Sequence, residues 1–152
     1  MKKVGDLGEY LVSRWLKLQN YELLAHNWRC RWGEIDLIVR DRQSQTVAFV
    51  EVKTRSANNW DSDGLLAITA SKQQKLLTTA SLFLAAYPDL ENLPCRFDVA
   101  LVSYQGRRSL TSGTEYQNIL DLIVTSQVEI GQAIAINGVQ LRLQQYLRNA
   151  FE

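Results

Sequence analysis

The chain has 152 residues, of which 46% are apolar and 22% charged, with only two prolines and a formal net charge of +1. This composition is typical of a single folded domain and excludes a disordered or fibrous protein. The near-neutral charge excludes a protein that coats nucleic acid non-specifically through a large basic excess.

The first third of the chain is predicted to form one helix and three strands. Apolar residues recur at helical spacing over residues 4–19, with Asp6 as a candidate N-cap. A short strand is expected at about residues 22–27, where the alternation is weak. The clearest strands span residues 35–40 and 46–54, and the short polar turn between them predicts a hairpin.

After this hairpin, residues 56–64 have the composition of a loop. A helix is predicted over residues 72–87, with either Thr69 or Ser71 as its N-cap, and it ends before a proline. Residues 96–102 read as a further core strand. These elements alternate in a way that is typical of one layered domain.

The pattern is weaker in the remaining part of the chain. Residues 105–115 are polar and predict a loop, whereas residues 133–143 predict a hairpin that turns at Asn137-Gly138. A short helix is expected at residues 144–151. The whole chain is therefore predicted to be an α/β domain, with a mixed β-sheet flanked by helices.

Three charged residues interrupt the two apolar strands of the central hairpin. Charged groups inside such strands are costly unless they are paired, hydrogen-bonded or bound to a metal. Glu51 and Lys53 share one face of their strand, because strand side chains alternate. Pairing in the hairpin can bring Asp36 alongside Glu51, since opposed Cβ atoms in adjacent strands lie about 5 Å apart. Two carboxylates and an ammonium group can therefore meet.

This combination suits a metal-dependent phosphodiesterase. Mg²⁺ binds a few carboxylate oxygens, keeps several waters and accepts phosphate oxygens as further ligands, and Mn²⁺ can replace it. Asp36 and Glu51 would bind the ion, which would activate a water, while Lys53 would stabilise charge on the scissile phosphate or position that water. The predicted reaction is hydrolysis of a nucleic-acid backbone, in DNA more than in RNA.

Several sequence blocks, taken together, resemble a known family. The pattern of Glu9, Asp36 and Glu51-Val52-Lys53 is similar to that of the PD-(D/E)xK nuclease superfamily. A nearer resemblance is to the YraN-like family of predicted endonucleases, long classed as an uncharacterised protein family. The blocks that carry it are Gly5, Gly8-Glu9, Gly33-Glu34-Ile35-Asp36-Leu37-Ile38, Phe49-Val50-Glu51-Val52-Lys53-Thr54-Arg55 and Arg96-Phe97-Asp98-Val99.

The resemblance implies a restriction-endonuclease-like core over residues 4–102 within a single domain, residues 1–152. Residues 105–143 would be a β-rich insertion, and the terminal helix would follow it. The resemblance also implies that Glu9 joins the site from the first helix, which gives a catalytic set of Asp36, Glu51, Lys53 and Glu9. The candidate metal-binding set is Asp36, Glu51, Val52 and Glu9. Branched or recombining DNA is the implied substrate.

Each of these residues also has a plain structural interpretation. Alternating charges on a strand often mark a solvated face. Glu9 lies three residues after Asp6 and could complete a capping box with it. Glu34 could orient Lys53 or a ligand, or could be an exposed turn residue. Asp98 could hydrogen-bond locally within its strand.

Contacts with nucleic acid are expected from residues outside this carboxylate cluster. Arg55, Lys72 and Arg31 are the candidates to hold phosphates, with Lys72 at the start of the second helix, where phosphate is attracted. Lys75 is interpreted as part of a solvated helix face. Among the four tryptophans, Trp60 is the best candidate to stack on a base.

Other sequence features limit the location and the partners. Cys30, Cys95 and the single histidine, His26, are too scattered for a zinc site, so His26 is interpreted as structural. No apolar run is long enough to span a bilayer, and we therefore expect a cytoplasmic protein with no membrane partner. A homodimer is possible, because two-fold symmetry suits a nuclease that cuts both strands. The alternative function is a nucleic-acid-binding module that cuts weakly or not at all.

Overall fold

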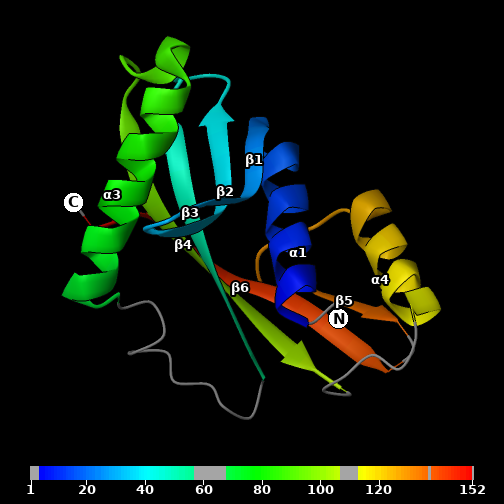
Figure 1. The fold of residues 1–152 in the computed structure, drawn as a ribbon. Helices are drawn as coiled ribbons and strands as arrows, with labels where there is room; N and C mark the ends of the chain where they lie inside the picture. The colour runs from blue at the N-terminus through cyan, green and yellow to red at the C-terminus, as the bar shows by residue number, and fades with distance from the viewer. Residues whose placement is uncertain (1–3, 57–67, 107–112, 137, 152) are drawn as a thin grey trace.

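A mixed β-sheet with helices on both faces forms the molecule (Figure 1). The computed structural model describes residues 4–56, 68–106, 113–136 and 138–151. The elements, in chain order, are α1 (Val4–Leu18), β1 (Tyr21–Cys30), β2 (Gly33–Asp41), β3 (Val47–Ser56), α3 (Ala70–Ala86), the 3₁₀ turn η2 (Pro88–Leu90), β4 (Cys95–Gln105), α4 (Gly113–Thr125), β5 (Ala133–Ile136) and β6 (Val139–Phe151).

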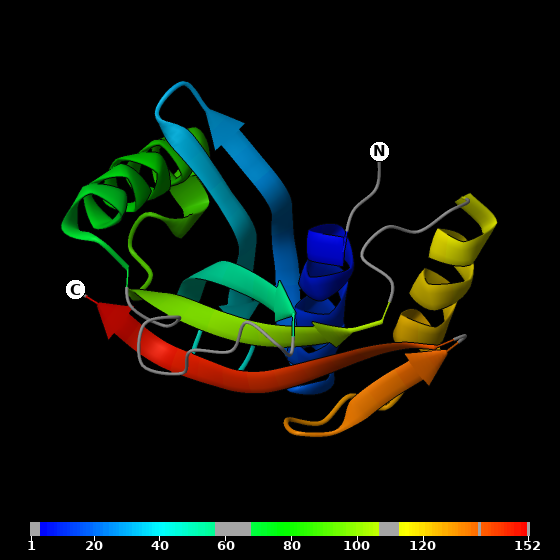
Figure 2. The ribbon, with the colours of Figure 1, turned by 90° about the horizontal axis from the view of Figure 1, so that it is seen from below.

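The six strands lie in the order β1-β2-β3-β4-β6-β5. Neighbouring strands are antiparallel except β3 and β4, which are parallel. Parallel neighbours need a crossover connection, and α3 lies in the connection between β3 and β4. In Figure 2, β6 lies alongside β4 and carries β5 on its outer edge. The predicted α/β class with a mixed sheet is therefore confirmed.

Alternating side chains of β3 divide the core into two layers. Ala48 and Val50 face α1, which in turn packs against α4, while Val47 and Phe49 face α3. Figure 1 shows strands β1 to β4 running between α3 on one side and α1 on the other. Because Glu51 continues the series of Val47 and Phe49, its side chain lies on the α3 side of the sheet, as the alternation predicted.

Helix α1 packs against β3 at unusually close range. A Cβ added to Gly8 would clash with the Thr54 hydroxyl, so only glycine fits at this crossing. Glu9 follows directly, and this close approach fixes its height above the sheet. Gly8 therefore allows the helix to pack closely against β3, and Glu9 places a polar side chain near the strands.

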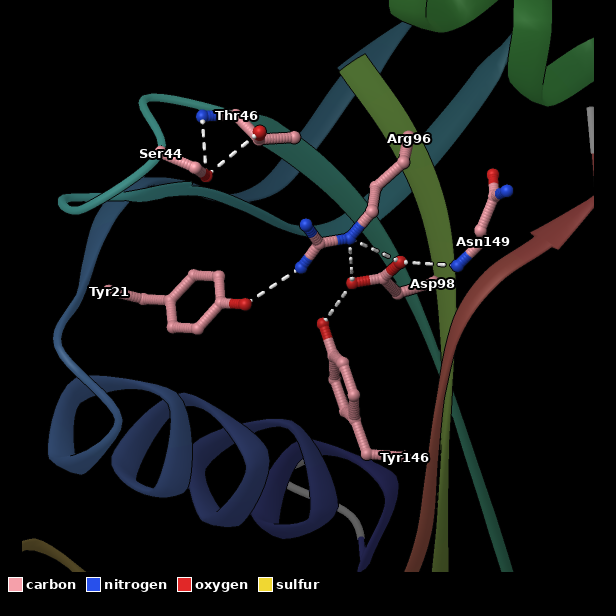
Figure 3. Close-up of polar contacts among 7 residues, drawn as sticks. All are labelled: Tyr21, Ser44, Thr46, Arg96, Asp98, Tyr146 and Asn149. Atoms are coloured by element: carbon pink, nitrogen blue, oxygen red, sulfur yellow. Dashed lines mark hydrogen bonds and ion pairs between the residues drawn. The ribbon is translucent and has the colours of Figure 1, made fainter. Parts of the chain in front are cut away.

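A buried polar network joins β1, β4 and β6 (Figure 3). The carboxylate of Asp98, which is fully buried, accepts from Arg96 Nε at 3.0 Å, from the Tyr146 hydroxyl at 2.6 Å and from the Asn149 N–H at 3.0 Å. Arg96 also donates to the Tyr21 hydroxyl at 2.7 Å. The structural interpretation of Asp98 is thus supported, because four hydrogen bonds engage its carboxylate.

Several sequence-based boundaries need correction in the first half of the chain. Asp6 does not cap the first helix, because α1 begins at Val4 and Asp6 lies in its first turn. The short strand predicted at residues 22–27 is the longer β1, whose register shifts between Leu23 and Ala25. That irregularity interrupts the alternation and explains the weak signal. Thr69, not Ser71, is the N-cap of α3, and its hydroxyl accepts from the Lys72 N–H at 3.2 Å.

The second half holds the largest errors. The helix predicted at residues 144–151 is wrong, because β6 continues to Phe151 and pairs with β4. The segment predicted as a β-rich insertion also contains a helix, α4, which begins within the predicted loop at residues 105–115. The hairpin predicted at residues 133–143 is confirmed as β5 and β6. Asn137 and Trp60 lie outside the described residues, as does most of the loop predicted at residues 56–64.

Within the described ranges, no helix combines the length and the apolar character that a crossing of the bilayer requires.

Candidate active site

Asp36 lies where strands β2 and β3 separate. The two strands pair from Arg40 opposite Val47 to Leu37 opposite Val50. Beyond this pair, the Asp36 carboxylate replaces a backbone acceptor, because its Oδ2 accepts a hydrogen bond from the Val52 N–H at 2.8 Å. A side chain thus satisfies a backbone donor that the strand pairing leaves open, which holds the carboxylate in a fixed position.

Glu51 shares a cleft with Asp36. This cleft has a volume of about 500 Å³ and lies between the strands and the N-terminal half of α3. Lys72 donates from Nζ to Glu51 Oε1 at 2.7 Å, so the helix supplies a cation to the carboxylate. The lining residues are Gly33, Glu34, Asp36, Glu51, Thr69, Ser71, Lys72, Lys75, Leu76 and Thr79.

Burial and nearby acidic groups together determine the electrostatics at Asp36. Burial raises the pKa of Asp36 to about 8, and the negative charges of Glu51, Glu9 and Glu34 act in the same direction. The hydrogen bond from Val52 opposes this rise. The site therefore favours any added positive charge, whether a proton or a metal ion, at Asp36.

Lys53 belongs to the same electrostatic cluster from its place on β3. Burial lowers the pKa of Lys53, and the positive charges of Arg55 and Lys72 lower it further, while Glu51 raises it. Its ammonium group is thus close enough to Glu51 to respond to the charge of that carboxylate. This position is compatible with a cation that faces a substrate phosphate beside the two carboxylates.

Glu9 approaches from the α1 side, but its carboxylate is engaged with β1. Glu9 Oε1 lies 2.8 Å from His26 Nε2, and the Tyr10 ring packs edge-on against the imidazole with centroids 5.0 Å apart. The capping box with Asp6 is wrong, because Asp6 is inside the helix. His26, interpreted as structural, is thus the partner of a candidate site residue.

The donor set determines which metals the site could hold. Among the described residues, no group of three or more His, Cys, Asp or Glu side chains lies close enough together to hold a metal ion. Asp36 and Glu51 nevertheless provide two carboxylates in one cleft, with the Val52 backbone beside them. Mg²⁺ is commonly held by one or two carboxylates, with waters and substrate phosphates as its remaining ligands. The residues present therefore fit a hard divalent cation.

The three residues predicted to hold phosphates occupy different places. Lys72 lies in the cleft, at Glu51. Arg31 lies outside it, at the tip of the β1–β2 hairpin, with its guanidinium 4.8 Å from the centroid of the Trp32 ring. Arg55 is exposed on β3 and donates to the Thr54 carbonyl at 2.9 Å. Of these three residues, Lys72 is the one that contacts a carboxylate of the cleft.

Glu34, Lys75 and Trp32 lie in or near the cleft in ways that differ from their sequence-based interpretation. Glu34 lines the cleft and pairs with Arg29 Nε at 2.9 Å, so it is not simply an exposed turn residue. Lys75, interpreted as solvated, also lines the cleft. Trp32 was not singled out as a stacking residue, although it is 52% exposed. Its neighbours Arg29, Arg31 and Gly33, which are typical of an exposed polar turn, were the available signal.

Comparison with known sequences identifies relatives over most of the chain. A family model described as "Uncharacterised protein family UPF0102" matches residues 8–102. A UPF0102 protein of Acaryochloris marina is 47% identical, with 98% of this chain and 90% of that protein covered. Another, of Synechocystis, is 45% identical with 99% of both chains covered. On these matches, the chain belongs to the uncharacterised protein family UPF0102.

Proposed function

We propose that the protein is a nuclease that depends on Mg²⁺ or Mn²⁺ and hydrolyses phosphodiester bonds of DNA, with branched or recombining DNA as its substrate. One observation carries the proposal. Asp36 and Glu51 converge in one cleft where β2 and β3 separate, and Lys72 and Lys75 line the same cleft. The similarity of the sequence blocks to the YraN-like and PD-(D/E)xK nucleases supports the same function.

Each residue has a distinct role in this proposal. Asp36 and Glu51 would hold the ion, with Glu9 as a further ligand once it leaves His26. A bound divalent cation would lower the pKa of a water and neutralise charge on the scissile phosphate. Lys53 would stabilise the negative charge that develops on that phosphate. Lys72 would exchange its contact with Glu51 for a contact with a substrate phosphate.

The direct test is cleavage of defined DNA substrates. Purified protein is incubated with linear, nicked, flapped and four-way DNA in Mg²⁺, Mn²⁺ or EDTA. We expect cleavage that depends on metal and falls by about 100-fold or more in Asp36→Asn and Lys53→Ala. Asp89→Asn, an exposed carboxylate beyond the far end of α3, is the matched control and should cleave as the wild type does. Cleavage in EDTA, or undiminished cleavage by Asp36→Asn, would contradict the proposal.

A second readout is independent of catalysis. Mn²⁺ should raise the melting temperature of the wild type, because a ligand that binds the folded state stabilises it. Asp36→Asn should lose most of this rise, whereas Asp89→Asn should keep it. An equal rise in all three proteins would mean that the ion binds elsewhere.

One observation favours a second candidate function, a nucleic-acid-binding module that does not cut. Lys72 already neutralises Glu51, and His26 already engages Glu9, so these two carboxylates have partners without a metal. DNA binding that needs no metal, together with the absence of cleavage on all four substrates, would establish this alternative.

The proposed activity also bears on assembly. A nuclease that cuts both strands of a duplex is suited to a homodimer with two-fold symmetry, because each site then faces one strand. Light scattering of the purified protein would give the mass directly. A mass of 17.4 kDa would correspond to a monomer and would leave one site per particle.

A further inference from the structure

Trp32 is an exposed aromatic residue beside the candidate active site. It lies at the tip of the β1–β2 hairpin, and 52% of its surface is exposed. The other two described tryptophans are packed: Trp15 is 8% exposed, and Trp28 lies edge-on against Phe83 with centroids 5.4 Å apart. The indole of Trp32, unlike these two, is therefore not part of the hydrophobic core.

The turn that contains Trp32 is held against helix α3 by hydrogen bonds and close packing. The backbone N–H of Trp32 donates to Cys30 Sγ at 3.4 Å, and the Cys30 thiol donates to Thr79 Oγ1 at 3.8 Å. Thr79 is fully buried in α3, and a Cβ on Gly33 would lie only 3.0 Å from its hydroxyl. A fixed backbone lowers the entropy that an aromatic platform loses when a ligand binds.

A groove separates this tip from α3 and lies next to the cleft. It has a volume of about 610 Å³, which is within the range of sites for small organic ligands. Arg31 and Trp32 line one side, and Ser71, Gln74, Lys75 and Thr78 line the other. Ser71 and Lys75 also line the cleft that holds Asp36 and Glu51, so the groove adjoins the cleft.

The chemistry of the groove matches one nucleotide. Its lining residues include two cations, Arg31 and Lys75, and no acid. The Arg31 guanidinium lies over the Trp32 ring, 4.8 Å from its centroid, which places positive charge on one face of the indole. Planar bases stack on aromatic side chains, and phosphates are attracted to arginine and lysine. One site therefore offers both a stacking surface and compensating charge.

We propose that this groove binds an unpaired nucleotide of the substrate, with its base stacked on Trp32 and its phosphate near Arg31 and Lys75. The inference rests on the proposed nuclease function and narrows its substrate class. Bases inside a duplex are stacked on each other and do not offer their faces to a side chain. The substrate is therefore DNA with a single-stranded segment next to the scissile bond, such as a flap or a splayed junction.

The test compares binding of two DNA forms in EDTA, where metal-dependent cleavage cannot interfere. One is a splayed-arm DNA and the other a continuous duplex of equal length. Trp32→Ala should weaken binding of the splayed-arm DNA about tenfold or more, and Trp32→Phe should weaken it less, because a phenyl ring retains part of the surface on which a base stacks. Duplex binding should not change. Tyr87→Ala, at an exposed aromatic residue beyond the C-terminus of α3, is the matched control and should bind both forms normally.

A photochemical experiment locates the contact. Splayed-arm DNA with 5-iododeoxyuridine in the unpaired arm should cross-link to Trp32, and mass spectrometry identifies the modified peptide. A cross-link elsewhere, no loss of affinity in Trp32→Ala, or an equal loss for both DNA forms would overturn the proposal. Because binding is measured without metal, a wild type that binds selectively but never cuts would refute only the nuclease function. A wild type that cuts, with an unaffected Trp32→Ala, would refute only the subsite.

Discussion

The environment of Asp36 links the chemistry of the cleft to the stability of the protein. Its pKa is raised to about 8, chiefly by burial and then by the nearby Glu51, whereas the ordinary value is 3.8. Between these two pH values the folded protein holds a proton that the unfolded chain has released. The free energy of unfolding should therefore fall as pH rises from about 4 to about 8, and the loss should be complete above that range.

The difference in free energy of unfolding between the wild type and an Asp36→Asn variant tests this pH dependence. Urea unfolding of the wild type and of Asp36→Asn from pH 5 to 9 isolates the contribution of this one carboxyl group. The difference should change by at most about 1.4 kcal/mol per pH unit and then level off above pH 8. Mg²⁺ competes with the proton, so it should stabilise the wild type more at pH 8 than at pH 6. A difference that is constant over the whole range would contradict the raised pKa.

The sequence identified some residues of the candidate site and could not identify others. Asp36, Glu51 and Lys53 were predictable, because charges inside apolar strands are conspicuous and strand alternation places them on known faces. The contact between Lys72 and Glu51 depends on how α3 packs against the sheet, and the contact between Glu9 and His26 depends on how α1 packs against β1. No local pattern reports either distance. Trp60 was preferred to Trp32 as a stacking residue, because the exposure of Trp32 is a property of the folded surface.

Helix α1 owes its position to the lack of a side chain at Gly8. Gly8→Ala should destabilise the protein by about 1–3 kcal/mol, because the new methyl group would overlap the Thr54 hydroxyl and push the helix from β3. Glu9 should move with the helix, so any metal-dependent rise in melting temperature should also shrink. Thermal and urea unfolding of the variant measure both effects.

A second substitution separates this clash from a general loss of helix stability. Thr54 Oγ1 is buried and has no hydrogen-bond partner within the described residues, so its removal should cost little. Gly8→Ala combined with Thr54→Ala should therefore recover much of the lost stability. Gly5→Ala, where an added Cβ meets nothing within 4 Å, is the matched control and should not destabilise α1. No recovery in the double variant would show that the close approach is not the cause.

The secondary structure shows where sequence patterns are sufficient and where they are not. α3 was predictable because it has an N-cap residue, an apolar stripe and a terminating proline. α4 was missed although Tyr116, Ile119 and Ile123 recur at helical spacing and are buried, because the preceding polar residues suggested a loop. β6 was mistaken for a helix near its end. There its partner is β4, and an irregular register near Asn149 disturbs the alternation.

The buried network around Asp98 should control the stability of the whole molecule. Asp98→Asn removes the negative charge that pairs with Arg96, and the loss of one partner of a buried ion pair costs about 3–5 kcal/mol. Tyr146→Phe removes one donor and should cost about 1–3 kcal/mol. Urea unfolding gives both values. Tyr87→Phe, at an exposed tyrosine, is the matched control and should be nearly neutral. A larger loss for Tyr146→Phe than for Asp98→Asn would contradict the central role of the carboxylate.

The position of β6 has a consequence for biosynthesis. β6 is made after the other described elements, yet it lies inside the sheet, between β4 and β5. While the ribosome is still translating this segment, one edge of β4 has no partner, and open strand edges are prone to pair with other chains. The nascent protein is therefore vulnerable to aggregation until residues 139–151 have emerged. The contacts of Asp98 with Tyr146 and Asn149 can form only after this segment has emerged.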